Sequence, residues 1–373
     1  MILLPLLGDT ETKMSEIYSE NNEYYPKRNI YLPTKMIEAL QQDADRFEAF
    51  KKKHGSRNMN NFISCLLLGY YEDYSEERNE LAASVRRILE NEISDTQILS
   101  NMTTCLLNEL SPRSRNYEKE KKMPHLPYKP TKDTWGFIRN IELSSNDTVS
   151  SLSKYLRDMF ASYLSLPIYE REKIIFKESV AVLEKAIEKG QAVILSSLTG
   201  GDRIFRVIPY KLQHSSEEMF NYLLCQSYND YYKTETPFTM RLCRIQKPKI
   251  VTGANTVNPE IQHLLDLMSK RTPQYTIYKD EISCVLITKK GLRTYNRIYH
   301  SRPDPLEDPP IENLPDGSRK YYFNHSRDQL KFYFRRFEAD EAIVLYPPEL
   351  AEEIKTFHED AWKAYEKGKS IEA

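Results

Sequence analysis

The N-terminal part of the chain passes from an aperiodic arm to a strand pattern and then to a helical one. Residues 1–25 are polar and aperiodic after one short apolar run, which predicts a flexible arm. From residue 27 the positions alternate, with Arg28, Ile30 and Leu32 on one face and Lys27, Asn29 and Tyr31 on the other. Pro33 and Thr34 end this predicted strand. A helical stripe follows at Met36, Ile37, Leu40 and Phe47.

A second helix is predicted after the lysine-rich turn "KKKHGSRN". Asn58 or Asn60 is a plausible N-cap, and the apolar spacing consists of Phe62, Ile63, Leu66, Leu67 and Tyr70. One short strand and two helices cannot enclose a core, because an isolated strand has no partner for its backbone groups. The pattern therefore predicts that this segment pairs with a second copy of the chain in a homodimer.

The middle region, residues 75–176, is predicted to be mostly helical. It contains a basic excursion at 113–132, where seven Lys/Arg against two Glu between Arg113 and Lys132 leave five net positive charges. The stretch "TWGFIRNIEL" is read as a strand, and residues 149–176 as a long helix broken at Pro167. That strand and helix are an alternative partner for the N-terminal strand within the same chain.

Residues 177–247 change to the pattern of a small sheet. A helix with Gly190 as its C-cap precedes four strand-like segments, of which the first two flank the turn "TGGD". Such a series predicts a strongly bent sheet or barrel. Residues 248–373 contain further strand patterns, "EISCVLITK", "RKYYFNH" and "AIVLYPP", a helix capped by Ser326 and a closing helix after Pro348. The fold class expected is therefore α+β with several domains.

Composition and charge narrow the functional classes. With 53 Lys+Arg and 54 Asp+Glu, any affinity for nucleic acid has to come from local patches. Five scattered cysteines without a C-x-x-C argue against a disulfide framework or a zinc site, and no segment suits a membrane span or an export signal. We expect a cytoplasmic protein without a metal or cofactor.

Enzymatic function is the weakest class for this sequence. No metalloprotease, Walker, nucleophile-elbow or dinucleotide motif occurs. His325, Ser326 and Asp328 lie close together in sequence, but Ser326 suits a helix cap better than a catalytic triad. We therefore expect a protein that is not an enzyme.

The segment from Ala186 to Ile245 resembles a WYL domain, a small Sm-like β-barrel. The matching features are Arg206 to Pro209, the triplet Asn221-Tyr222-Leu223 and the strand "MRLCRI". The resemblance implies a site for nucleic acid or an anionic ligand at Arg206, Tyr222, Arg241 and Arg244. Asn221, Ser197 and Cys243 depart from the family pattern. The C-terminal residues 248–373 resemble the α/β extension that often follows WYL domains.

Strand geometry limits what the two arginines of this strand can do together. Residues 241 and 244 are an odd number apart, so on a regular strand their side chains face opposite sides. A bulge or a sharp bend is needed to bring both to one groove. Arg244 also lies among apolar residues, so a structural salt bridge is the alternative to a ligand contact.

Residues 26–74 resemble a ribbon-helix-helix segment, in which paired strands enter a nucleic-acid groove. The resemblance implies that Lys27, Asn29 and Tyr31 read bases and that the start of the second helix, Arg57 to Asn60, contacts phosphate. A ribbon used only for dimerisation is the alternative.

Over nearly its full length the chain resembles the WYL accessory proteins of type VI (VI-D) CRISPR systems, which enhance RNA-guided RNA-cleaving effectors. That resemblance implies a homodimer that binds single-stranded RNA and acts on a type VI effector. The alternative is a ligand-responsive, DNA-binding transcriptional regulator. The sequence does not choose between a ribbon that binds nucleic acid and one that only dimerises.

Overall fold

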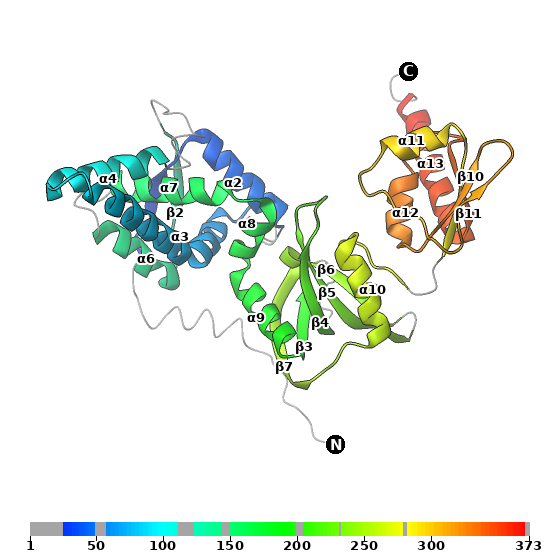
Figure 1. Cartoon of the computed structure of the whole chain (residues 1–373), viewed down its shortest axis with the longest axis horizontal. Helices are drawn as coiled ribbons and strands as arrows, with labels where there is room; N and C mark the ends of the chain where they lie inside the picture. Colours follow the sequence, from blue (N-terminus) through cyan, green and yellow to red (C-terminus); the bar gives the residue numbers. More distant parts are fainter. Residues whose placement is uncertain are drawn as a thin grey trace. The chain divides into compact units, whose positions relative to one another are not determined.

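The computed structural model describes residues 25–48, 57–110, 123–143, 150–198, 204–230, 233–278 and 282–369. The chain divides into two compact units. Unit 1 comprises Met1–Arg46 and Phe50–Leu166, and unit 2 comprises Phe47–Ala49 and Pro167–Ala373. Figure 1 shows their helices and strands, and within the described ranges these make a mixed α and β protein with three separate sheets.

Unit 1 is built around a two-stranded ribbon whose strands both come from this chain. Strand β1 (Arg28–Tyr31) pairs antiparallel with β2 (His125–Tyr128), with Arg28 opposite Tyr128 and Tyr31 opposite His125. The expectation that β1 needs a second copy of the chain is therefore wrong, because β2 satisfies its backbone groups internally. Partnership within the chain is found, but through residues 125–128.

Each ribbon strand is followed by two helices. After β1 come α2 (Thr34–Arg46) and α3 (Met59–Glu90), and after β2 come α6 (Lys132–Leu143) and α7 (Ser150–Ser165). The sequence Pro-Thr-Lys follows both strands, at 33–35 and 130–132. Side chains from both halves form one core, including Ile30, Leu32, Met36, Leu66, Tyr128, Ile138, Leu156 and Phe160.

The stretch "TWGFIRNIEL" is helix α6, and the strand predicted there is wrong. Its buried side chains are Thr134, Ile138 and Ile141, whose spacing of four and three residues fits one face of a helix. The hydroxyl of Thr134 also hydrogen-bonds within the turn that starts the helix, where it accepts from the backbone N–H of Thr131 at 2.9 Å. Local capping and helical burial thus override the strand propensity of the aromatic residues.

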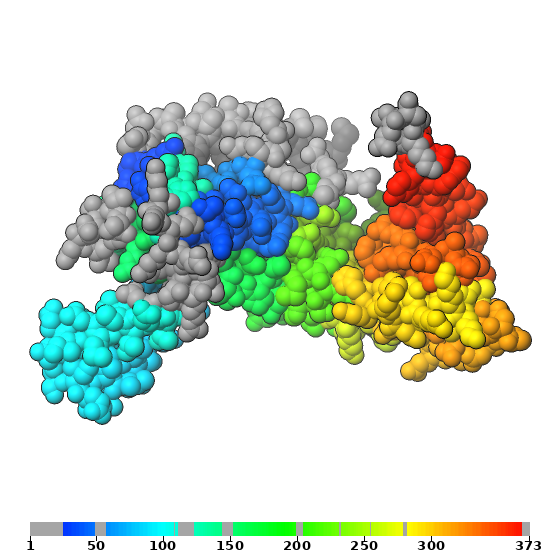
Figure 2. Space-filling model, turned by 90° about the horizontal axis from the view of Figure 1, so that it is seen from above, coloured from blue at the N-terminus to red at the C-terminus, as the bar shows by residue number. Residues whose placement is uncertain are grey.

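Beyond Tyr74, α3 continues as one arm of a helical hairpin with α4 (Thr96–Leu110). Asp95 starts α4 by accepting hydrogen bonds from the backbone N–H groups of Gln97 and Ile98. In Figure 2 the hairpin, coloured cyan, stands out from the rest of its unit. The helical prediction for this stretch is confirmed, with a break between the two helices.

Unit 2 contains an antiparallel five-stranded sheet in the order β6-β5-β4-β3-β7. Helices α8 (Ile168–Ile175) and α9 (Lys177–Glu188) precede it, and Pro167 begins α8 at the predicted break. The strands are β3 (Gln191–Ser197), β4 (Ile204–His214), β5 (Asn221–Asn229), β6 (Thr234–Arg241) and β7 (Ile245–Ala254). Among the described residues β6 and β7 do not pair with each other, so this sheet is open and the closed barrel remains a prediction.

Helices pack against two sides of this sheet. Helix α9 contributes Val180, Leu183 and Ala186 to a core with β3, β4, β5 and β6. Helix α10 (Pro259–Lys270), which the sequence reading missed, forms a second core with Leu224 of β5. Both faces of the sheet are therefore covered by a helix.

The C-terminal part of unit 2 is a four-stranded sheet in the order β11-β8-β10-β9. Its strands are β8 (Ser283–Ile287), β9 (Glu312–Asn313), β10 (Arg319–Phe323) and β11 (Ala342–Tyr346). Its helices are α11 (Gly291–Arg297), α12 (Arg327–Phe334) and α13 (Pro348–Lys369). Ser326 caps α12 as predicted, because its hydroxyl accepts from the backbone N–H of Gln329 at 3.1 Å.

Candidate nucleic-acid interface

Three of the four side chains expected at a WYL-type site lie around one cavity in unit 2. Tyr222, Arg241 and Arg244 line this cavity of about 460 Å³, together with Glu218 and Tyr275. We call it the arginine cavity. Tyr222 comes from the start of β5 and Arg241 from the end of β6, and these two residues are directly opposite each other in the sheet register.

A single helical turn brings both arginines to the arginine cavity. Strand β6 ends at Arg241, and Leu242–Arg244 form the 3₁₀ turn η1. A 3₁₀ helix has three residues per turn, so residues three apart lie on the same side. Arg241 and Arg244 therefore line one cavity, whereas Leu242 and Cys243 are buried. The bend that strand geometry requires is present.

Arg241 is held by an aromatic ring and a carboxylate. Its guanidinium carbon lies 3.3 Å from the centre of the Phe220 ring, a cation–π contact, and its Nη1 lies 4.0 Å from Oε1 of Glu48. Only 14% of its side chain is exposed. The arginine is thus preorganised, with its charge already partly neutralised.

Glu48 also pairs with Arg244. Nε and Nη2 of Arg244 donate to the two carboxylate oxygens at 3.3 and 3.2 Å, and this hydrogen bonding raises the pKa of Arg244 above its ordinary value. Glu48 is the second residue after the end of α2, following Phe47, and has a φ of 49°. Arg244 therefore forms a salt bridge, as one of the two interpretations of the sequence expected, and any anion at this site has to compete with Glu48.

Phe47 anchors Glu48. Its fully buried ring packs edge-on against Phe176 and Phe220, with ring centres 6.2 and 6.5 Å apart. Phe220 thus contacts both Phe47 and Arg241. The sequence showed Phe47 as part of a helical stripe, but nothing in the local pattern indicated that Glu48 would reach the arginines.

Tyr222 is more enclosed than a stacking platform usually is. Its side chain is 7% exposed, and its hydroxyl donates to Glu218. Burial, and then the Glu218 carboxylate, raise the pKa of Tyr222 well above its ordinary value. Tyr275, which also lines the arginine cavity, is half-buried and therefore less enclosed than Tyr222.

Glu172 fixes the two chain segments that carry the site. Its carboxylate is fully buried and accepts from the backbone N–H of Asn221 at 2.6 Å, from the Asn221 amide at 2.9 Å and from the backbone N–H of Cys243 at 3.1 Å. Burial raises the pKa of Glu172, although these hydrogen bonds oppose the shift. Sequence reasoning missed Glu172, yet a glutamate between Ile168 and Ile175 on one helical stripe was a usable signal.

Arg206 does not line the arginine cavity. It is exposed on β4, where its Nη2 donates to the side-chain oxygen of Asn255 at 2.9 Å. Its position opposite Ile194 of β3 places it elsewhere on the sheet. The four residues expected at a WYL-type site are therefore separated in space, with three around the arginine cavity and Arg206 outside it.

The outward face of the ribbon in unit 1 carries the residues expected to read bases. Lys27, Asn29 and Tyr31 are exposed, and the adjacent strand adds the exposed residues His125, Pro127 and Lys129. The rings of Tyr31 and His125 lie 6.0 Å apart. We call these six residues the ribbon face.

The two residues expected to contact phosphate have structural partners. Nε of Arg57 lies 2.7 Å from Oδ1 of Asp45 in an exposed ion pair. The Asn60 amide donates to the backbone oxygen of Lys129 at 3.0 Å and accepts from its backbone N–H at 2.7 Å. Of the two asparagines predicted as N-cap of this helix, Asn58 is the one that caps α3. Asn60 thus ties α3 to the end of β2, while the Arg57 phosphate contact stays a prediction.

The basic excursion, the "TGGD" turn, metal sites and membrane spans are the remaining features that the sequence raised. Residues 113–122 of the basic excursion lie outside the described residues, as does the "TGGD" turn. Within the described ranges, no group of three or more His, Cys, Asp or Glu residues could hold a metal ion. No described helix combines the length and the apolar character that crossing a membrane requires.

Comparison with known proteins supports the fold. No protein-family model and no curated protein matches the sequence. A solved structure described as a CRISPR Cas-related protein matches with a TM-score of 0.64 and 19% identity, over 94% of this chain and 96% of that one. The proteasome accessory factor PafBC of Arthrobacter aurescens has a TM-score of 0.27 and 16% identity, over 65% of this chain and 37% of that one, which is too weak to carry an argument.

Proposed function

We propose that this chain is a nucleic-acid-binding accessory protein that holds single-stranded RNA at the arginine cavity. The observation that carries the proposal is the placement of Arg241, Arg244 and Tyr222 around one cavity. A guanidinium pair next to aromatic rings suits a single strand, because phosphate contacts supply charge and bases stack without regard to sequence. The protein acts by binding and not as an enzyme.

Phosphate binding at this site proceeds by exchange with Glu48. A phosphate oxygen takes the place of the Glu48 carboxylate on Arg244 and approaches Arg241, which Phe220 already orients. The guanidinium groups keep a negatively charged partner throughout, so neither is left unpaired. Arg206 on the exposed surface adds a weaker backbone contact.

The proposed biological role is enhancement of a type VI CRISPR effector in the cytoplasm. The resemblance in sequence to WYL accessory proteins supports it, as does the likeness in fold to a CRISPR Cas-related protein. We further propose that unit 1 is an internally duplicated ribbon-helix-helix, that the sheet of unit 2 is an Sm-like WYL domain, and that the protein acts as a homodimer through a surface other than β1. Light scattering tests the dimer, and an RNA-cleavage assay with a type VI effector tests the enhancement.

The binding experiment compares single-stranded RNA, single-stranded DNA and duplex DNA by fluorescence anisotropy at several salt concentrations. We expect single-stranded RNA to bind best and Arg241→Met to lower both its affinity and the salt slope, by about 0.7 per lost phosphate contact. Arg297→Met, which removes the same charge from exposed α11, is the matched control. Equal RNA binding by the Arg241 variant and the unmodified protein would contradict the proposal.

A DNA-binding regulator is the second candidate, and the ribbon face favours it. An antiparallel ribbon with Lys27, Asn29 and Lys129 pointing outward has the shape of an element that enters the major groove of duplex DNA. Tighter binding of duplex DNA than of single-stranded RNA in the same experiment would support this candidate.

A further inference from the structure

A second cavity adjoins the arginine cavity and is built partly by the C-terminal sheet region of unit 2. It measures about 420 Å³ and shares Thr239, Gln274 and Tyr275 with the arginine cavity. Its remaining wall consists of Thr276, Tyr278 and residues at the start of α12, with Glu353 of α13. Because three residues line both cavities, a molecule bound in one is adjacent to the other.

The chemistry of this second cavity differs from that of its neighbour. It contains two carboxylates, Asp328 and Glu353, against one guanidinium, Arg327, so it disfavours a phosphate. Glu353 is already paired with Lys331 at 2.9 Å. Among the described residues, none hydrogen-bonds or pairs with the Asp328 carboxylate, which is exposed to the cavity.

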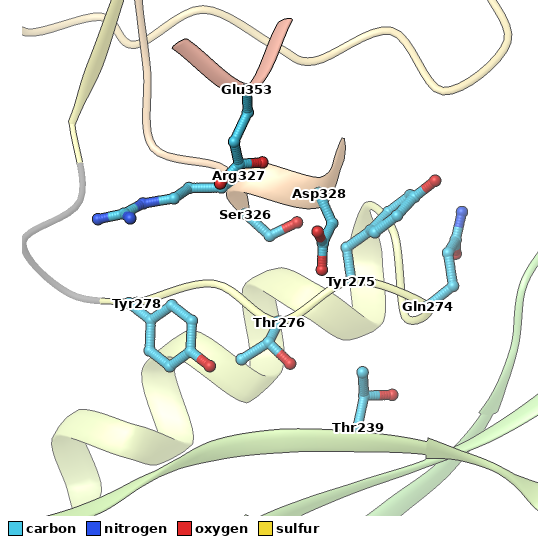
Figure 3. A pocket seen from close by; sticks show the side chains of 9 residues that line it. All are labelled: Thr239, Gln274, Tyr275, Thr276, Tyr278, Ser326, Arg327, Asp328 and Glu353. Atoms are coloured by element: carbon cyan, nitrogen blue, oxygen red, sulfur yellow. The ribbon is translucent and has the colours of Figure 1, made fainter. Parts of the chain in front are cut away.

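Aromatic side chains accompany this carboxylate. Figure 3 shows Asp328 reaching from α12 toward Thr239 of β6, with Tyr275 and Tyr278 on either side in this view. Thr239 itself is engaged, since its hydroxyl donates to the backbone oxygen of Pro273 at 2.6 Å. Tyrosine rings beside a carboxylate acceptor form the kind of surface that stacks a base and accepts hydrogen bonds from its edge.

We propose that the second cavity holds the nucleoside next to the phosphate bound at Arg241 and Arg244, and that Asp328 selects guanine there. Guanine presents two neighbouring N–H donors, N1–H and N2–H, which match the two oxygens of one carboxylate. Uracil presents a single N–H between two oxygens, which the carboxylate repels. The proposal rests on the proposed function, because the bound phosphate positions the strand.

The test measures binding of four RNA pentamers by competition anisotropy, UUUUU and the three with G, A or C at the centre. We expect the guanine pentamer to bind about tenfold more tightly than UUUUU, within the range of one bidentate base contact. Asp328→Asn replaces one acceptor with a donor, so the preference falls to about twofold, because the guanine pentamer loses its bidentate contact and UUUUU is no longer repelled. Asp360→Asn on exposed α13 makes the same change away from the cavity and keeps the preference.

A second readout separates base contact from structural damage. A pentamer with 6-methylisoxanthopterin at its centre, a fluorescent guanine analogue that keeps both N–H donors, loses fluorescence when the base stacks on an aromatic ring, and Tyr278→Leu is expected to reduce that loss. Thermal denaturation checks that each variant is folded.

The possible failures are distinguishable. No measurable binding of any pentamer or longer RNA overturns the proposed function. Binding that depends on Arg241 but shows no base preference, or a preference that survives Asp328→Asn, overturns the guanine subsite alone.

Discussion

The ribbon face of unit 1 and the arginine cavity of unit 2 present polar side chains in opposite ways. Lys27 and Asn29 are exposed, and none of the described residues hydrogen-bonds their side chains. In the arginine cavity, Arg241 is mostly buried and Arg244 is paired twice with Glu48. The ribbon face is open to any polyanion, whereas in the arginine cavity Glu48 competes with an incoming anion for the arginines.

This difference implies that the ribbon face attracts nucleic acid in general, whereas the arginine cavity binds it selectively. Exposed lysines attract a phosphate backbone without losing a protein partner, but salt screens them strongly. A buried arginine pair binds only what replaces its carboxylate and fits the walls, so shape and hydrogen-bonding pattern matter more. The cavity is therefore the better candidate for recognition, and the ribbon face for general affinity.

The largest effect we expect comes from Glu172→Ala, which breaks the arginine cavity and leaves the ribbon intact. The change leaves two backbone N–H groups and the Asn221 amide without their buried acceptor. At about 1–3 kcal/mol for each unsatisfied group, a loss of roughly 3 kcal/mol or more in the free energy of unfolding is expected. Chemical denaturation measures it, with exposed Glu184→Ala as the control. A loss below about 1 kcal/mol would mean that Glu172 does not hold the site together.

The next effect is a gain of affinity in Glu48→Gln. Without its charge, residue 48 competes weakly for Arg241 and Arg244, so single-stranded RNA should bind more tightly, by about fivefold for a pair worth roughly 1 kcal/mol. Glu38→Gln removes the same charge from an exposed position of α2 and should change the affinity little. If the two variants bind alike, Glu48 is not a competitor and the contrast between the two surfaces fails.

The ribbon shows how far sequence periodicity reaches. The alternation at residues 27–32 correctly predicted that Lys27, Asn29 and Tyr31 are exposed and that Ile30 and Leu32 are buried. It did not identify β2, because "HLPY" is four residues long and contains a proline, which lowers its apparent strand propensity. Pairing partners distant in sequence leave little local signal, so pairing of β1 with a second copy of the chain was inferred in place of the internal pair.

The arginine cavity illustrates the same limit at the level of a site. Family-like motifs identified Tyr222, Arg241 and Arg244, and period-two geometry correctly required a bend between the two arginines. The residues that control those side chains, Glu48 and Glu172, come from segments 196 and 71 positions away from their respective partners Arg244 and Cys243. Only the folded chain brings them together, since neither belongs to a contiguous motif.

A smaller effect is expected for the ribbon face. Replacing both Lys27 and Lys129 with alanine should reduce the salt slope for duplex DNA by about two, if each lysine contacts one phosphate. Binding of short single-stranded RNA should change less than twofold, because that RNA occupies the arginine cavity. Anisotropy titrations at three salt concentrations measure both quantities. An equal loss for both nucleic acids would indicate that the two surfaces act on the same molecule.

The smallest effect we expect is that of Arg206→Ala, which tests where the WYL-type site ends. Arg206 is exposed and makes one side-chain hydrogen bond, to Asn255, so its loss should change the free energy of unfolding by no more than about 0.5 kcal/mol. Because it lies outside the arginine cavity, single-stranded RNA affinity should fall only about twofold at low salt and hardly at all at high salt. The comparison is Arg241→Met under the same conditions. If Arg206→Ala weakens RNA binding as much as that variant does, the bound strand extends from the cavity across β4, and the recognition surface is wider than the cavity itself.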